Sequence, residues 1–150
     1  RVRRVLHNYA AASSVLDRPT DPAAESITVA AADSSALLLP SFAPKPPPTW
    51  DHELPSLLAE GGQTRLATGD GQPCGLLHYV TADPTDLQIR RLSVPPGAGT
   101  TARRLLAAAV TPATTRLVVA YVDEAGSLYS LLPQLGFQEL DSDWEMVCDL

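Results

Sequence analysis

The stretch DLQIRRLSVPPGAGTTARRLL, residues 86–106, carries the strongest fold signal in this sequence. Residues 86–94 begin it with four aliphatic side chains spaced among polar ones, a pattern that predicts a strand. Five Pro, Gly and Ala residues follow at 95–99, and the threonine pair 100–101 can then cap a helix that runs to residue 110. A strand, a tight loop and a helix in direct succession predict the first half of a βαβ crossover.

The hydrophobic phase changes inside this predicted strand. Leu87 and Ile89 are apolar at odd positions, whereas Leu92 and Val94 are apolar at even positions. A regular strand cannot hold both pairs on one face, because its side chains alternate with a period of two. A β-bulge near Arg90-Arg91 would restore the phase and bend the strand. A strand buried on both faces is the alternative, and it needs no bulge.

Residues on either side of this stretch complete a pattern of strands and helices. Gly69-Asp70-Gly71 between two apolar runs predicts a hairpin, because glycine supplies the positive φ that such turns need. The other elements are a strand at 27–32, helices at 36–39 and 49–60, strands at 64–68, 74–80 and 116–122, a helix at 127–135 and a final strand or two in 138–150. This order predicts an α/β (α+β) fold, with a mixed, mostly antiparallel central sheet and helices on both faces.

The N-terminal segment is basic, although the whole chain of 150 residues has a net charge of −6. Residues 1–18 hold four arginines and a single aspartate, and Val5, Leu6 and Tyr9 are spaced as on one side of a helix. We therefore expect a basic helical extension and linker over residues 1–25. The main domain then covers residues 26–150.

Composition excludes several classes of function. No stretch approaches the roughly 18–20 uncharged apolar residues of a membrane span, and the acidic balance argues against a nucleic-acid partner. Cys74 and Cys148, the only cysteines, read as reduced thiols of a cytoplasmic protein. The three histidines lie far apart and lack ligand partners at metal-site spacing, so no metal is expected.

Four segments together resemble the GNAT superfamily of acyl-CoA-dependent N-acyltransferases. They are the bulged strand and its Pro-Pro loop (87–96), the helix segment Ala102–Leu106, the strand 117–122, and the helix ending in Leu-Gly-Phe (131–137). The resemblance covers about 125 residues in topology and about 50 in motif. It implies acetyl-CoA or another acyl-CoA as co-substrate and a transferase acting on an amine.

The resemblance also implies where the coenzyme would bind. In the family, backbone N–H groups at the start of the helix after the bulged strand hold the pyrophosphate, where the helix dipole favours negative charge. The corresponding positions here depart from the family motif, since Gly97 replaces its Arg or Gln, Thr100 replaces its Gly, and only Ala102 matches. The candidate cofactor-binding residues are Leu92, Ser93, Val94, Gly97, Ala98, Gly99, Thr100, Thr101, Ala102 and Arg103.

The catalytic acid of the family is also replaced. Family members often carry a tyrosine four residues before the glycine of Gly-Phe, where it can protonate the departing thiolate. This chain has Leu132 at that position, and Tyr129 lies almost one helical turn earlier. Tyr129 is therefore the candidate catalytic residue, and packing against the sheet is its alternative role.

Two functions from different classes stay open on the sequence. One is an active N-acyltransferase, and the other is a GNAT-like domain that has lost catalysis and serves as a ligand-binding or dimerisation module. For an active enzyme we expect a small or peptide-terminal amine as acceptor, beside the proline-rich loop 40–50. Phe42 and Trp50 would form apolar walls there, and Asp51, Glu53 and Glu60 would attract a cation. The alternative is that Trp50 packs inward. A homodimer is left open.

Overall fold

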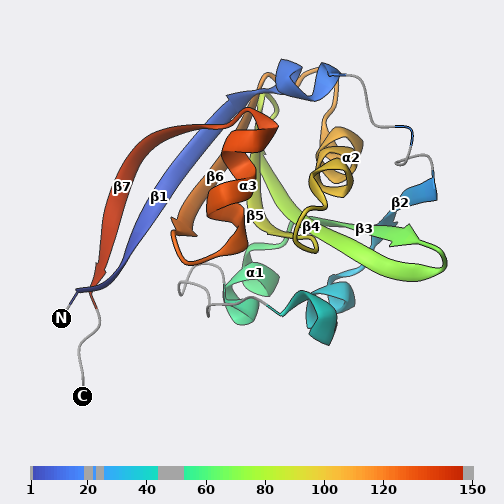
Figure 1. Cartoon of the computed structure of the whole chain (residues 1–150), viewed down its shortest axis with the longest axis horizontal. Coiled ribbons are helices and arrows are strands. Elements are labelled where there is room, and N and C mark those ends of the chain that lie inside the picture. Colours follow the sequence, from blue (N-terminus) through green and yellow to red (C-terminus); the bar gives the residue numbers. More distant parts are fainter. Residues whose placement is uncertain (1, 19–21, 23–25, 44–52, 147–150) are drawn as a thin grey trace.

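Seven strands form one mixed sheet, in the order β2-β3-β4-β5-β6-β1-β7 (Figure 1). The computed structural model describes residues 2–18, 22, 26–43 and 53–146. β5 and β6 pair in parallel, and every other neighbouring pair is antiparallel. The strands are β1 (Val2–Ala12), β2 (Ile27–Ala32), β3 (Gln63–Gly69), β4 (Gln72–Asp83), β5 (Asp86–Ser93), β6 (Arg116–Asp123) and β7 (Gln138–Met146).

Helices cover both faces of this sheet, which confirms the predicted α/β class. α2 (Gly99–Ala109) and α3 (Ser127–Leu135) pack on one face, over the larger hydrophobic core. α1 (Leu54–Glu60) and the short 3-10 turns at 34–38 and 40–42 lie on the other face, over a smaller core. The helix expected at 36–39 is thus a 3-10 turn. The helix expected at 49–60 begins at Leu54, and residues 49–52 lie outside the described residues.

The predicted bulge in β5 is confirmed. His78 of β4 pairs with Arg91, but the next residue of β4, Tyr79, pairs with Ile89, so Arg90 is the extra residue. Leu92 accordingly faces the same core as Ile89, although three positions separate them. The bulge lets one strand keep both apolar pairs of its sequence on the α2/α3 side.

The N-terminal segment forms a strand over Val2–Ala12, followed by a 3-10 turn at Ser13–Asp17, so the amphipathic helix predicted around Val5, Leu6 and Tyr9 is wrong. Residues 1, 19–21 and 23–25 of the predicted extension lie outside the described residues. β1 lies inside the sheet, antiparallel to β6 on one side and to β7 on the other. Leu6, at 4% exposure, and Tyr9, at 3%, are buried on opposite faces of β1. A strand buried on both faces does not alternate apolar and polar residues. The spacing of the apolar residues in β1 is therefore compatible with a helix as well as with a strand. Figure 1 shows β1 and β7 leaving the body together as a two-stranded ribbon.

Local signals place the remaining elements correctly. Asp70 and Gly71 both have positive φ, +51° and +75°, and they form the turn between β3 and β4 that the sequence predicts. α2 begins at Gly99, one residue before the threonine pair, and its N-cap is Ala98, which makes no side-chain capping bond. The predicted cap at Thr100 or Thr101 is therefore wrong, because both threonines lie inside the helix. Gly75 of β4 allows α2 to approach closely: a Cβ there would lie 2.8 Å from Cγ2 of Thr101 and 2.9 Å from Cδ1 of Leu105.

Candidate functional site

The central strands separate at a defined level of the sheet. The parallel pairing of β5 with β6 ends at Ile89 and Val119. Both strands bulge immediately afterwards, β5 at Arg90 and β6 within residues 120–121. Because each bulge bends its strand and increases the local twist, two bulges at one level turn the strand ends apart. β5 and β6 therefore part after this pair, and the bulges of both strands contribute to their separation.

A cavity of about 180 Å³ lies beside the end of β5. Its walls are the loop after β5 and one side of α3, and the lining residues are Val94, Pro95, Pro96, Gly97, Ser127, Ser130, Leu131 and Gln134. Pockets for whole drug-sized ligands have volumes of about 300–1,000 Å³. This cavity therefore fits only part of a molecule the size of coenzyme A.

Backbone donors stand at the start of α2, next to this loop. The intrahelical ladder begins with the N–H of Ala102, which donates to the carbonyl of Ala98 at 3.1 Å. The N–H groups of residues 99–101 precede that bond and have no acceptor inside the helix. The loop itself is built from small residues, and Gly97 has a φ of +78° with open space around the position of a Cβ. Such an arrangement suits an anionic group.

The candidate cofactor residues divide into two groups in the structure. Gly97 is exposed, and Ser93, Val94, Ala98, Gly99 and Thr100 are partly exposed along the loop and first turn. Leu92, Thr101 and Ala102 are at most 5% exposed, so their side chains belong to the core. The guanidinium of Arg103 donates to the carbonyl of Val15 at 2.6 Å and thereby holds the turn after β1. Arg103 thus has a structural partner.

Tyr129 lies on the other flank of α3 from this cavity. Its ring centroid is 4.8 Å from that of His7, on β1. His7 in turn contacts Glu139 of β7, with 2.7 Å between Nδ1 and Oε1. Successive residues of a helix are about 100° apart, so Tyr129 is turned away from Ser130 and Leu131, which line the cavity. A catalytic role for Tyr129 stays a prediction, and Leu132 is fully buried in the core.

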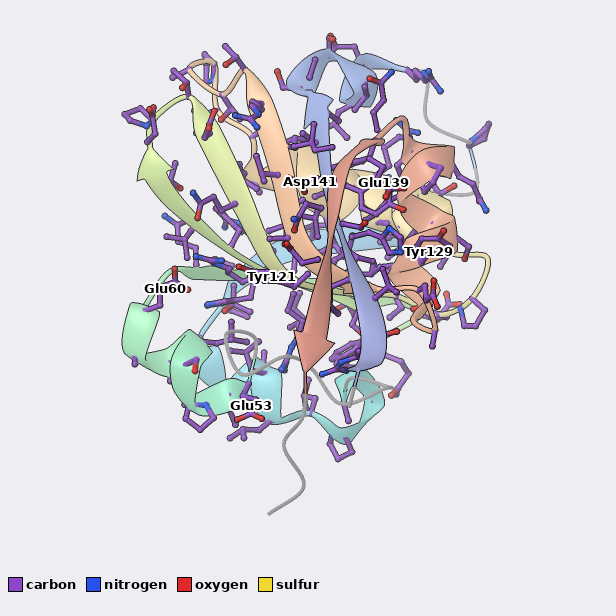
Figure 2. All side chains as sticks on the ribbon, turned by 90° about the vertical axis from the view of Figure 1, so that its left-hand side faces the viewer. Glu53, Glu60, Tyr121, Tyr129, Glu139 and Asp141 are labelled. Carbon is purple, nitrogen blue, oxygen red and sulfur yellow. The ribbon has the colours of Figure 1, made fainter. Side chains whose placement is uncertain are left out.

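The face of the sheet on the α1 side carries charged and polar groups around the same bulges. Arg90 forms an ion pair with Glu60 of α1, 2.5 Å between Nη2 and Oε1. Arg91 donates to the carbonyl of Leu37 at 3.5 Å, and burial lowers the pKa of its guanidinium. Figure 2 shows Glu60 on α1 and Tyr121 nearer the middle of the sheet. Tyr121 is 36% exposed, and no motif in the sequence marks it as a site residue, because its place depends on the bulge of β6.

His78 lies on this face next to Arg91, but it serves the fold. Its ring bonds Thr64, 2.9 Å from Nδ1 to Oγ1, and the carbonyl of Gly61, 3.0 Å from Nε2. Burial lowers the pKa of His78 from its ordinary value of 6.5, although the bond to Gly61 opposes that shift. The ring lines a second cavity of about 330 Å³ between the end of β2, β3 and α1.

The acceptor residues expected from the sequence are only partly brought together. Phe42 is 3% exposed and packs with Leu57 and Leu76, so it is core rather than an open wall. Glu60 is neutralised by Arg90, whereas Glu53 is exposed. Trp50 and Asp51 lie outside the described residues. Within the described part of the chain, no group of three or more His, Cys, Asp or Glu side chains is arranged to hold a metal ion.

Two further expectations concern the reduced state of the cysteines and the absence of a membrane-spanning helix. Cys74 is a free thiol, and burial raises its pKa. Cys148, the other cysteine predicted to be reduced, lies outside the described residues. Of the helices that the structure describes, none is long and apolar enough to span a membrane.

Comparison with solved structures identifies the architecture as the GNAT fold. A GCN5-related N-acetyltransferase from Kribbella flavida matches with a TM-score of 0.56 and 15% identity, over 93% of this chain and 56% of its own. A tandem GNAT protein from the clavulanic acid biosynthesis pathway matches with a TM-score of 0.60 and 15% identity, over 95% and 52%. This chain therefore has a divergent form of the GNAT fold.

A third structure, a functionally unknown conserved protein from Staphylococcus epidermidis, has a TM-score of 0.67 at 11% identity, over 93% of this chain and 59% of its own. The chain thus spans a little more than half of the length of each of these proteins. No family model matches the sequence, and no curated protein does. Identities this low relate the chain to these proteins by fold.

Proposed function

We propose that this chain is an acyl-CoA-dependent N-acyltransferase, with acetyl-CoA as the first acyl donor to test and a small or peptide-terminal amine as acceptor. The observation that carries the proposal is the separation of β5 from β6 after Ile89 and Val119. It lies next to a loop and helix start whose backbone donors suit an anion. The GNAT fold of the acetyltransferases that match this chain supports the same reaction class.

The residues present fit parts of an acyl-CoA. The N–H groups of residues 99–101 would hold the pyrophosphate, and Gly97 keeps that approach open. The edge of β5 that faces β6 after Ile89 is not paired with it, so backbone groups of residues 91–93 would bond the pantetheine arm as a strand would. The thioester supplies an activated carbonyl for direct attack by a neutral amine. A backbone N–H of the bulged strand would polarise that carbonyl.

A second candidate function is an inactive GNAT-like module that binds a ligand or a second copy. The specific observation in its favour is the engagement of Arg103 with Val15, combined with a buried Leu132 at the family's acid position. Such a module would keep the gap between β5 and β6 without the groups that assist chemistry. Neither Arg103 nor the described part of β7 lines the cavity beside Gly97, so the cavity itself is kept in either case.

Calorimetric titration with acetyl-CoA and with free CoA tests the proposal. We expect heat from both, and release of free thiol when acetyl-CoA is mixed with a panel of amines. Binding without thiol release across polyamines, amino acids, aminoglycosides and peptide N-termini would favour the inactive module. Absence of heat and of a thermal shift at millimolar ligand would refute both the donor and the site.

A further inference from the structure

Tyr121 occupies the second bulge at the level where the sheet opens. Val119 and Val122 both face the core under α2 and α3. Because only residues 120 and 121 lie between them, both of these residues must point to the opposite face, where α1 lies. The same arithmetic puts Arg90 and Arg91 of β5 on that face. The bulges therefore place Tyr121 on the β6 side of the opening and the two arginines on its β5 side.

The backbone of Tyr121 is held in an unfavourable conformation. Its φ is +58°, in the left-handed region that bulky residues rarely adopt. Asp70, in the turn between β3 and β4, is the other non-glycine residue with positive φ in the described part of the chain. Strained residues of this kind persist only where surrounding structure fixes them, and they concentrate at functional sites.

Asn8 is the group that fixes Tyr121. Its Oδ1 accepts the backbone N–H of Tyr121 at 3.0 Å. Its Nδ2 donates to two carboxylates of β7, Asp141 at 2.7 Å and Asp143 at 3.1 Å. One amide side chain on the central strand of three therefore ties the bulge of β6 to β7, and it sets the direction in which the tyrosine leaves the sheet.

The position of Tyr121 differs from that of Tyr129 in a way that matters for the reaction. Tyr129 packs beside His7 on the α2/α3 face, whereas Tyr121 is 36% exposed on the α1 face, two residues after the last β5–β6 pair. Figure 2 shows the two tyrosines apart, Tyr121 toward the middle of the sheet and Tyr129 beside α3. An acceptor that enters from the α1 side would meet the ring of Tyr121.

We propose that Tyr121 forms the β6-side wall of the acceptor entrance and that Asn8 is its positioning residue. The inference rests on the proposed acyltransferase function and specifies how that site selects an amine. An aromatic ring offers apolar area to the carbon chain of the acceptor and its negative face to an ammonium group. The aromatic ring, rather than the phenol hydroxyl, makes this contact with the acceptor.

The kinetics of four variants test whether Tyr121 forms this wall of the acceptor entrance. The probes are acetyl-CoA with glycinamide, spermidine, L-lysine and tyramine, and the readout is thiol release. Tyr121→Ala should raise the KM for amine about tenfold, the loss expected for an aromatic contact, and leave the KM for acetyl-CoA within about twofold. Tyr121→Phe should resemble the wild type. Asn8→Ala should raise the amine KM in the same direction, and Leu140→Ala, an exposed apolar residue of β7, should change neither.

A second measurement observes the tyrosine rings directly and does not depend on turnover. All four tyrosines are replaced by 3-fluorotyrosine, and each ¹⁹F resonance is assigned with a Tyr→Phe variant. With free CoA bound, the amine of the panel that has the lowest KM should move the Tyr121 resonance and leave that of Tyr129 in place. In Asn8→Ala, the Tyr121 resonance should start at a different position and respond less.

The outcomes separate the two proposals. Turnover of an amine whose binding leaves the Tyr121 resonance unmoved would overturn the inference and leave the proposed function standing. A Tyr121→Phe variant that loses as much kcat as Tyr121→Ala would also overturn it, because the hydroxyl would then be the acting group. If the wild type does not bind acetyl-CoA, the proposed function is refuted, and so is the role of Tyr121 that rests on it.

Discussion

Ile89 and Val119 are the last paired residues of β5 and β6, and each is followed at once by a bulge in its own strand. Two bulges at one level bend both strands. If only one of the two strands were bulged, only that strand would bend at this level and its neighbour would continue straight. The opening on which the proposed chemistry depends is therefore a property of the pair.

The cavity between the loop after β5 and α3 gives the first prediction. Ser130→Trp places a large side chain on the flank of α3 that lines this cavity of about 180 Å³. Because the residue is exposed, the fold should tolerate the change, while the affinity for acetyl-CoA should fall at least about tenfold, which corresponds to about 1.4 kcal/mol. Calorimetry measures the affinity. Ala107→Trp, at an exposed position of α2, is the matched control and should bind normally.

The bond between Arg103 and Val15 gives the second prediction. Arg103→Met keeps much of the side-chain length but removes the donor to the carbonyl of Val15. We expect the free energy of unfolding to fall by about 1.5–3 kcal/mol, the usual contribution of a hydrogen bond to a charged group, with acetyl-CoA affinity unchanged. Urea unfolding measures the change in stability, and calorimetry measures the affinity for acetyl-CoA. A large loss of affinity in a stably folded variant would mean that Arg103 binds the coenzyme after all.

Close packing of α2 on β4 gives the third prediction. In Gly75→Ala the new Cβ would meet Thr101 at 2.8 Å and Leu105 at 2.9 Å. Overpacking of this kind costs about 1–3 kcal/mol, and the shift of α2 should weaken acetyl-CoA binding as well. Gly69→Ala is the control, since its Cβ would meet Cys74 at an ordinary 3.5 Å. Equal unfolding midpoints for the two variants would contradict this account.

Burial of His78 gives a pH dependence. Burial lowers the pKa of the folded state below the ordinary value of 6.5, so between the two values the unfolded chain binds the proton and the folded chain does not. The free energy of unfolding therefore rises with pH in that window, and the contribution is lost as the pH falls from about 6.5 through the folded-state pKa.

His78→Gln isolates that effect, because glutamine can still bond Thr64 and the carbonyl of Gly61 but does not titrate. We expect the stability difference between wild type and His78→Gln to favour the wild type more at pH 7.5 than at pH 5.5, as measured by urea unfolding at each pH. Carboxylates titrate in both proteins and cancel in this difference. A difference that grows in the acid direction would show that His78 is protonated in the folded state.

Local signals determined a large part of the fold. The change of phase between Ile89 and Leu92 predicted a bulge at Arg90-Arg91, and the structure decides for it over a bulge-free strand buried on both faces, because Ile89 and Leu92 reach one core. The pair Asp70-Gly71 specified its hairpin turn, since positive φ at both positions is rare outside such turns. Breakers at residues 95–99 separated β5 from α2 within one residue of the observed start.

Tertiary structure decided what long-range pairing controls. β1 is a strand because β6 and β7 bond it on both edges, and no local spacing near Leu6 and Tyr9 records that pairing. The bulge at Tyr121 likewise arises from the register between β6 and β1, which Asn8 fixes from 113 positions away in the sequence. Sequence thus determined the elements whose signals lie within a few residues, whereas the opening between β5 and β6 needed contacts between strands far apart in the chain.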